Sequence, residues 1–347
     1  MSREIDVKID KLVLLAVVLC AVVLVGELTA YGPNTHNYSA ECSAEDGIVD
    51  VSISSSSSDS YSIIYMDNGE FSPPTQLYIL LDERYDENFD EANETANLKK
   101  IDQQYAVDQV RISLGIRGFK DVAVCNGNQL LSAMADDIGS NIPKGLLVMT
   151  YALPEGIYSG SDGDMLFEWI AEGNSLYWMD SPIGTFYRDG SGLVQVDDGQ
   201  MLFFGKECVN IDGTDLALYE DNNTSLTKAL ALKWNRTING LNVSGIEGAV
   251  SMGFCQDGVS SVSMVPFGKG MICVLGGAYD KNQCDDISQI ISSGVSCYSN
   301  VLAIGNGTVT RGTSNVNFMI PEGTEKIHIS VLIGGYYTVY GRSFDVW

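Results

Sequence analysis

Between Gln76 and Gly294 the sequence alternates short apolar runs with longer segments of helical periodicity, and this alternation strongly constrains the fold. Buried strands are indicated by the runs QLYILL, DVAVCN, KGLLVMTYALP and SLYWM, and later by MLFFG, GAVSMGF, SVSMVPF and GMICVLGG. Helices are predicted between them, over 101–118, 127–141, 161–173 and 283–294. Strands that alternate with helices through short loops predict an α/β domain over 76–294, with a mainly parallel sheet and helices on both faces.

The last segment, 295–347, lacks a helical period and is rich in β-branched and aromatic residues, with Gly-containing turns at hairpin spacing. We predict that it forms a small antiparallel β module. Because it has few residues for a core of its own, it could borrow the strands expected near Val49 and Ile63. The region 31–75, which contains SISSSSSDSYS, is either a Ser-rich linker or a β-hairpin with a serine-rich tip.

An unbroken apolar run, Leu12–Gly26, lies near the N-terminus. It fits either a signal anchor, which would make residues 1–30 a transmembrane segment, or the core of a cleaved signal peptide. The anchor is the preferred interpretation, and it predicts a single-pass cell-membrane protein with the bulk of the chain outside the cytoplasm; secretion after cleavage is the alternative. Export agrees with the glycosylation acceptor sites at Asn37, Asn93, Asn222, Asn223, Asn235, Asn242 and Asn306.

The charge balance restricts the kinds of partner. The chain has 45 acidic and 20 basic residues, so its formal net charge is −25. This argues against binding to nucleic acid, since phosphate-backbone binding requires a basic surface. With no Cys-x-x-Cys pair and only two histidines, a zinc cluster is not expected, and Cys125 and Cys273 are predicted to be buried free thiols in strands.

The order of these segments resembles that of the class I glutamine amidotransferase-like fold, with ThuA-like and GIFT-type proteins as the nearest relatives. The segment IAEGNSLYWMDSPIG stands where that family displays its nucleophile after a strand, and GKGMICVLGGAYD stands where a late strand bears the histidine. The resemblance covers about 76–294 and implies a flavodoxin-like layered sheet. The whole chain also resembles membrane-anchored archaeal surface proteins.

The catalytic residues that this resemblance implies are missing. The family needs a Cys nucleophile and a His, yet Asp180 and Ser181 stand at the nucleophile position, and Gly276 and Gly277 stand where the histidine belongs. His328, in the C-terminal module, is interpreted as a packed or solvated strand residue. The missing residues therefore imply a non-catalytic domain. If the domain does have catalytic residues, Asp180 and Ser181 are the candidates.

Open parallel sheets bind their ligands at the carboxyl ends of the strands. The sequence places the predicted ligand-binding residues there: Asp82, Asn126, Tyr151, Asp180, Gly276 and Gly277. In the segment LLDERYDENFDEANET, acidic residues recur at four-residue spacing. This segment is either a solvated acidic loop or a Ca²⁺ site with Asp82 and Asp86 as ligands, and no other cofactor is expected.

Two functions remain open. In the first, a surface protein with a non-catalytic amidotransferase-like domain binds a glycan, a peptide or a partner protein. In the second, a carboxylate-dependent hydrolase, with or without a metal ion, acts on cell-surface carbohydrate through Asp180 and either Asp82 or Glu83. The missing Cys and His favour the first function.

Overall fold

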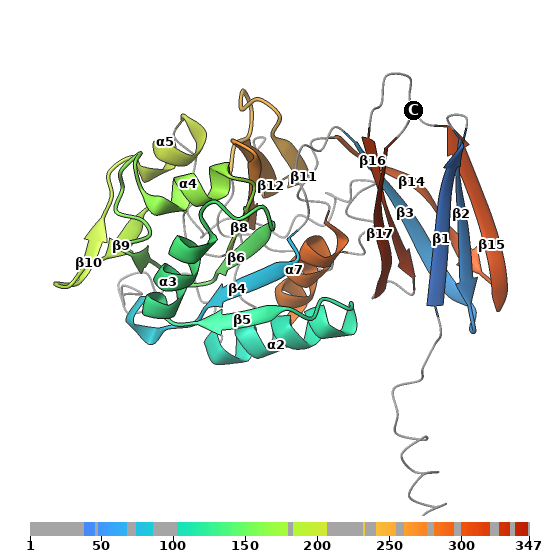
Figure 1. Ribbon diagram of the computed structural model, residues 1–347, viewed down its shortest axis with the longest axis horizontal. Helices are drawn as coiled ribbons and strands as arrows, with labels where there is room; N and C mark the ends of the chain where they lie inside the picture. Colours follow the sequence, from blue (N-terminus) through green and yellow to red (C-terminus); the bar gives the residue numbers. More distant parts are fainter. Residues whose placement is uncertain are drawn as a thin grey trace, which may run out of the picture.

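The computed structural model describes residues 38–45, 48–67, 74–85, 103–179, 183–206, 232, 241–254, 260–275, 281–294, 300–319, 326–333 and 337–345. Two regions lie side by side along the longest axis of the molecule (Figure 1). The α/β region comprises the described residues between 74 and 294. The two-sheet module comprises those within 38–67 and 300–345.

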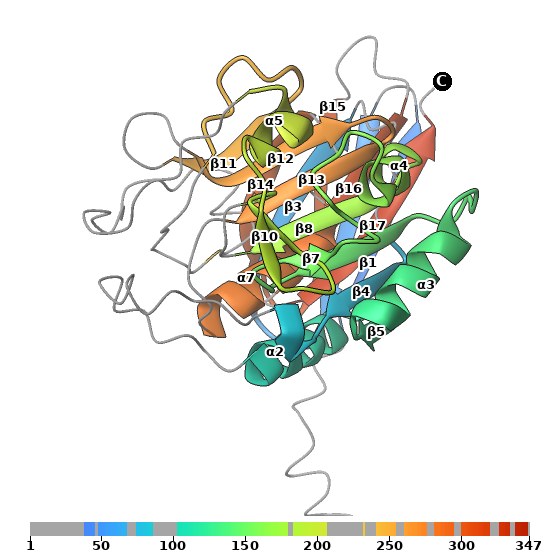
Figure 2. The same ribbon diagram turned by 90° about the vertical axis from the view of Figure 1, so that its left-hand side faces the viewer.

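The α/β region is built on a seven-stranded sheet with the order β11-β12-β13-β8-β6-β4-β5. Its parallel strands are β4 (Gln76–Leu80), β5 (Val122–Cys125), β6 (Lys144–Val148), β8 (Ser175–Met179) and β13 (Gly270–Leu275). Its antiparallel strands are β12 (Ser260–Phe267) and β11 (Val250–Phe254). The sheet is therefore mixed. Figure 2 looks onto this region with the module behind it.

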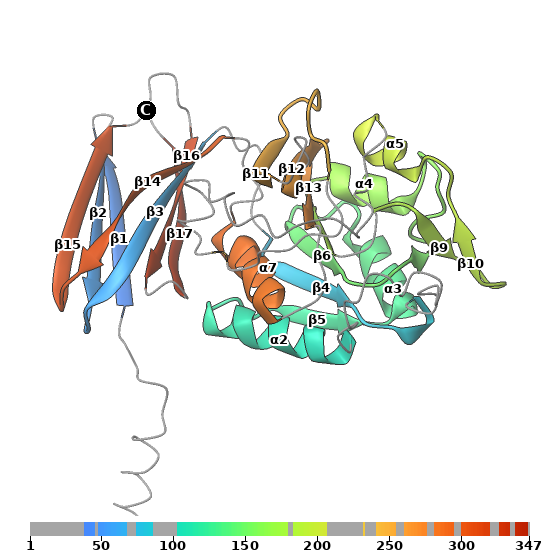
Figure 3. The same cartoon turned by 180° about the vertical axis from the view of Figure 1, so that it is seen from behind.

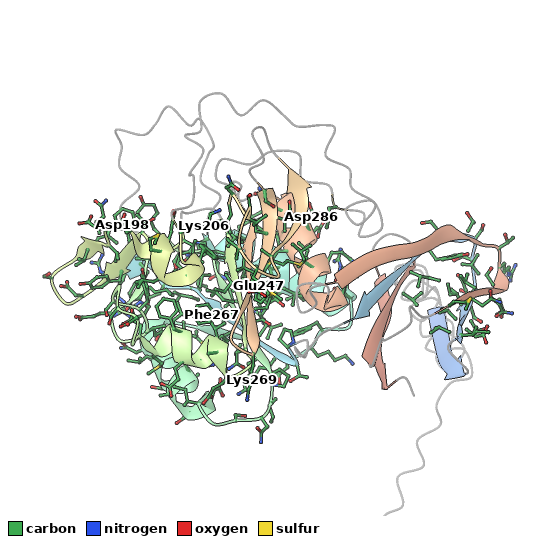
Figure 4. The ribbon with its side chains drawn as sticks, turned by 90° about the horizontal axis from the view of Figure 1, so that it is seen from above. Asp198, Lys206, Glu247, Phe267, Lys269 and Asp286 are labelled. Atoms are coloured by element: carbon green, nitrogen blue, oxygen red, sulfur yellow. The ribbon has the colours of Figure 1, made fainter. Side chains whose placement is uncertain are left out.

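Two layers of helices pack on the sheet. One layer consists of α2 (Gln103–Ile116) and α7 (Lys281–Ser293). The other consists of α3 (Gly127–Asp137), α4 (Met165–Ala171) and α5 (Gly199–Phe204). Figure 4 labels Asp198 and Lys206, which flank α5. Apolar side chains of both layers cover the sheet, so strands in its middle have no solvent face.

Strand β8 shows this burial most clearly, because all five of its residues are buried. Tyr177 and Met179 join the core under α2 and α7. Leu176 and Trp178 join the core under the other helices. Since successive residues of a strand point to opposite faces, an unbroken apolar run is what a strand between two layers requires.

Smaller elements lie beyond the carboxyl ends of the parallel strands. The 3-10 helix η1 (Glu83–Tyr85) follows β4. A three-stranded sheet of order β10-β9-β7 comprises β7 (Leu153–Pro154), β9 (Phe186–Arg188) and β10 (Leu193–Gln195). These pieces shape the edge at which a ligand of such a sheet would bind.

The two-sheet module combines both ends of the described chain. One sheet, of order β1-β2-β15, comprises β1 (Tyr38–Glu45), β2 (Ile48–Ser55) and β15 (Gly312–Met319). The other, of order β14-β3-β16-β17, comprises β14 (Asn300–Val309), β3 (Asp59–Asp67), β16 (Lys326–Ile333) and β17 (Tyr337–Asp345). The tail strands thus pair with the strands that contain Val49 and Ile63, the sharing expected from the sequence.

Helix α7 lies between α2 and the module strand β17, as Figure 3 shows from behind. Arg117, only 8% exposed, donates from Nε to Gln289 Oε1 at 2.6 Å and also donates to Ser113 Oγ. Ser113 Oγ donates in turn to Asp285 Oδ1 at 2.8 Å. These buried polar contacts fix the helix that touches the module to the α/β region.

The fold class predicted from the sequence is wrong. The described residues form seventeen strands in four sheets and only five α-helices, so the protein as a whole is sheet-rich and not flavodoxin-like, although helices cover both faces of its large sheet. Strand β12 is joined to β13 by Gly268 and Lys269 alone, and so short a connection allows only an antiparallel hairpin. The module is not a separate C-terminal unit. The predicted strand MLFFG lies largely in helix α5, because a short apolar run does not distinguish the two structures.

The predicted membrane helix also needs correction. None of the helices in the described part of the chain is long and apolar enough to cross a membrane. The predicted single-pass membrane location and the membrane contact through Leu12–Gly26 therefore have no support from the described helices. That run itself lies outside the described residues.

Candidate functional site

The carboxyl ends of β4, β5 and β6 lie at one edge of the large sheet, because these strands are parallel neighbours. After β5, the backbone N–H of Gly127 donates to Asp82 Oδ2 at 2.9 Å. After β6, the backbone N–H groups of Tyr151 and Ala152 both donate to the carbonyl of Tyr85, each at 3.1 Å. We call the residues 82–85, 126–127, 151 and 186–188 the carboxyl edge; it brings together three predicted ligand residues, Asp82, Asn126 and Tyr151.

Asp82 is held by the arginine two residues further on. Arg84 donates from Nε to Asp82 Oδ1 at 2.9 Å and from Nη2 to Oδ2 at 2.6 Å, and its backbone N–H reaches Oδ1 at 3.2 Å. The Asp82 side chain is 8% exposed, whereas that of Arg84 is 52% exposed. This partner was not predicted from the sequence, although planar guanidinium and carboxylate groups match each other through two parallel hydrogen bonds.

The Arg84 contact lowers the pKa of Asp82 to about 2, and the backbone N–H groups of Gly127 and Arg84 act in the same direction. The carboxylate is therefore ionised at neutral pH. A general acid must carry a proton at the working pH, so Asp82 is unsuited to that role. Its two oxygens accept four N–H groups, and the second predicted Ca²⁺ ligand, Asp86, lies outside the described residues, so the Ca²⁺ site stays a prediction.

Tyr85 and the start of α3 pack closely. A Cβ on Gly127 would lie 2.5 Å from the ring of the buried Tyr85, so a larger residue there would force that ring to shift. Burial raises the pKa of the Tyr85 hydroxyl. Asn126 Oδ1 accepts from the Gln129 N–H at 3.0 Å, while the Asn126 N–H donates to Gln129 Oε1 at 2.9 Å. The predicted ligand residue Asn126 thus caps a helix through its side-chain oxygen.

An aromatic pair forms the apolar part of the carboxyl edge. The Tyr151 and Phe186 rings stack with centroids 4.7 Å apart and planes 26° apart, and both side chains are half-buried. Strand β9 carries Phe186 and pairs in parallel with β7, which sets Arg188 opposite Pro154. Tyr151 was predicted from its place after a strand. Phe186 was not predicted. The one feature of the sequence that could have indicated a strand there is the short segment TFY shortly before the turn DGSG.

Several predicted site residues lie outside the described part of the chain. They are Asp86, Asp180, Ser181, Gly276 and Gly277, together with the acceptor residues Asn37, Asn93, Asn222, Asn223 and Asn235. Asn242 is described and half-buried, and its Oδ1 accepts from the Ser244 N–H at 3.0 Å. Asn306 lies on β14.

Within the described residues, no group of three or more His, Cys, Asp or Glu side chains could hold a metal ion. Cys125 and Cys273 are buried thiols, as predicted. Burial raises the pKa of the Cys125 thiol, so it stays protonated and unreactive at neutral pH. The chemistry that the described residues offer at the carboxyl edge is therefore that of aromatic rings, one ion pair and the hydroxyl of Tyr151.

No protein-family model and no curated protein matches the chain. Among the solved structures that match the chain are glycoside hydrolases at low sequence identity. The β-galactosidase of Rahnella sp. R3 has 16% identity and a TM-score of 0.39, with 75% of this chain and 36% of that one covered. The β-galactosidase of Bacillus circulans sp. alkalophilus has 12% identity and a TM-score of 0.38, with 77% and 36% covered.

A third similar structure is the exo-β-1,4-mannosidase Op5Man5 of Opitutaceae bacterium strain TAV5, with 12% identity and a TM-score of 0.35. The match covers 65% of this chain and 35% of the mannosidase chain. The chain thus spans about a third of the length of each of these enzymes. The predicted likeness to amidotransferases rested on a flavodoxin-like fold class and is corrected together with it.

Proposed function

We propose that this protein binds a carbohydrate at the carboxyl edge of its large sheet. The observation that carries the proposal is the stacked pair Tyr151–Phe186, whose half-buried rings keep part of their surface toward solvent. A sugar ring has an apolar face of C–H groups, which packs on an aromatic ring, and hydroxyls that need hydrogen-bond partners. The edge supplies both kinds of contact.

The polar partner is Arg84. Its Nε and Nη2 are bound to Asp82, so the guanidinium plane is fixed before a ligand arrives. A donor that is already oriented loses little conformational entropy when it binds a ligand. We assign Nη1, for which the described residues supply no partner, to a ligand hydroxyl.

The charge of the chain favours a neutral sugar over an acidic one. The formal net charge is −25, so an anionic ligand approaches against a repulsive field. The edge itself carries Asp82 and Glu83 against Arg84 and Arg188, so it has no excess of positive charge to attract an anion. Neutral oligosaccharides are therefore the ligand class that we assign to the edge.

Calorimetric titration of the full chain with neutral oligosaccharides, and with acidic ones of equal length, tests the proposal. The neutral series should bind, and Tyr151→Ala or Phe186→Ala should weaken binding at least about tenfold, because each removes an aromatic contact at the centre of the site. Tyr105→Ala, which removes a 44% exposed tyrosine on α2, is the matched control and should leave the affinity unchanged. Failure of the whole panel to bind, or unchanged affinity in both edge variants, would refute it.

A second candidate function is carbohydrate hydrolysis, and the observation that favours it is the ionised state of Asp82. Glycoside hydrolysis uses two carboxyl groups, one of which must be ionised to act as nucleophile or base. Asp82 meets the requirement of ionisation, but an oxygen would have to leave Arg84 or Gly127 before it could act, and it is unsuited to the role of the acid. Release of reducing sugar from the neutral panel, lost in Asp82→Asn while binding persists, would establish hydrolysis; binding without release by the parent protein would exclude it.

A further inference from the structure

We propose that a second copy of this chain pairs antiparallel with strand β15, so that the three-stranded sheet of the module continues into a six-stranded sheet. Strand β15 is the end strand of the order β1-β2-β15, and no described strand pairs with its outer side. In Figure 1 it lies at the end of the module away from the α/β region. An edge strand exposes backbone N–H and C=O groups that another strand can bind.

Proteins normally protect such edges with charges, prolines or bulges. The other end strands of the module carry these devices. Strand β14 shifts register against β3 between Ala303 and Gly305, and β17 shifts register against β16 between Thr338 and Tyr340. Strand β1 contains Glu41 and Glu45 in its sequence YSAECSAE.

Strand β15 has none of these protections. Its sequence GTSNVNFM contains no charge and no proline, and all eight residues pair with β2 in continuous register. Met319 is 80% exposed, and it pairs with Ile48, which is 43% exposed. A straight, uncharged edge strand is the kind that associates with another strand.

A copy of the same chain fits this edge because the strand is complementary to itself. In antiparallel pairing centred on Val316, the two Val316 side chains meet, and Asn315 of each copy lies opposite Asn317 of the other. Val316 pairs with Val51, which is 1% exposed, yet Val316 itself is only half-buried. The second strand would cover Val316 and extend the apolar layer between the sheets.

The charge of the chain also selects this edge for self-association. Two copies with a formal charge of −25 each repel one another over most approaches. The uncharged strand lets them meet without setting carboxylates opposite each other. A two-fold axis through Val316 makes the contact identical for both copies and closes the assembly at a dimer.

Sedimentation velocity over a dilution series tests the proposal on the full chain, in one mild non-ionic detergent for all samples. The parent protein should form a dimer that dissociates on dilution. Asn315→Lys with Asn317→Lys should raise the dissociation constant at least tenfold, because the two-fold axis sets lysines of one copy opposite those of the other. The double Asp variant at the same positions should behave likewise, and a mixture of the Lys and Asp variants should recover the dimer as a heterodimer.

The control is Ile112→Lys with Ile116→Lys on α2, which changes the exposed apolar residues of another surface, 57% and 52% exposed. It should dimerise like the parent protein. A monomeric parent protein at every concentration would overturn the proposal, and that is the outcome expected if a foreign strand occupies the edge. Dimerisation that survives in the β15 variants, or that is lost in the α2 variant, would overturn it as well.

Discussion

The α/β region and the two-sheet module bury the apolar residues of their strands in different ways. In the α/β region, helices cover the sheet on both sides, and strands such as β8 and β13 are buried at every position. In the module, β2 buries every second residue, because one face of its sheet packs inward and the other faces solvent. The first region is continuous in sequence, whereas the second joins the two ends of the described chain.

This difference also separates the two proposals. The carboxyl edge exists because parallel strands end together and their loops meet, as the Asp82–Gly127 and Tyr85–Tyr151 contacts show. The module has antiparallel strands and no such edge, but its open sheets leave end strands. A parallel sheet therefore offers a site for a small ligand, and an open sandwich offers an edge for another strand.

The largest expected effect contrasts the two cores. Trp178, 1% exposed between the layers at β8, should cost about 3–5 kcal/mol of unfolding free energy when changed to Ala, as large buried aromatic residues do. Ile53→Val in the module strand β2 removes one buried methylene and should cost only about 0.5–1.5 kcal/mol. Urea unfolding of both variants measures the two values. A cost for Trp178→Ala below that for Ile53→Val would contradict the layered description of the α/β region.

A second contrast concerns how closely the backbone packs. A Cβ on Gly199 in the α/β region would lie 2.0 Å from the carbonyl oxygen of Gly184, and backbone cannot move aside easily. A Cβ on Gly307 in the module would meet Tyr61 Oη at 2.7 Å, at the movable end of a side chain. Gly199→Ala should therefore cost about 1–3 kcal/mol and Gly307→Ala less, as thermal unfolding would show. Equal costs would mean that the two regions are packed alike.

The smallest expected effect is the acid response of the carboxyl edge. The folded-state pKa of Asp82 is about 2, below its ordinary value of 3.8. A lowered pKa contributes stability that is present above the ordinary value and is lost as the pH falls through the folded value. The stability difference between the parent protein and Asp82→Asn should therefore shrink as the pH falls from about 4 to about 2. Urea unfolding across that range measures it, and a constant difference would show that the Arg84 contact does not hold the carboxylate ionised.

Features that depend on residues close together in the sequence were predicted well, whereas features that depend on residues far apart were not. The strands at β4, β6, β8 and β13 were recognised because their apolar runs are local features. The pairing of β14 and β16 with β3 joins residues far apart in the chain, so composition alone did not define the module. Strand β12 was predicted as a strand, but its antiparallel direction was missed, because that direction follows from the two-residue connection to β13 and not from the apolar run itself.

At the site, the sequence placed Asp82, Asn126 and Tyr151 correctly at strand ends, but it did not predict the partners of their side chains. Asp82 is bound by Arg84, and Asn126 caps α3; both partners are near in sequence, so these contacts could have been foreseen. Phe186 is different. Its stacking on Tyr151 depends on where β9 docks, and no local pattern states that position.

The central claim is that the α/β region holds the ligand at its carboxyl edge and the module does not. Amide hydrogen exchange of the full chain, with and without the tightest-binding neutral oligosaccharide of the panel, tests it most directly. The account predicts slower exchange on binding in residues 82–85, 126–127, 151–152 and 186–188, with no change along β15. Protection confined to the module, with the carboxyl edge unaffected, would contradict it.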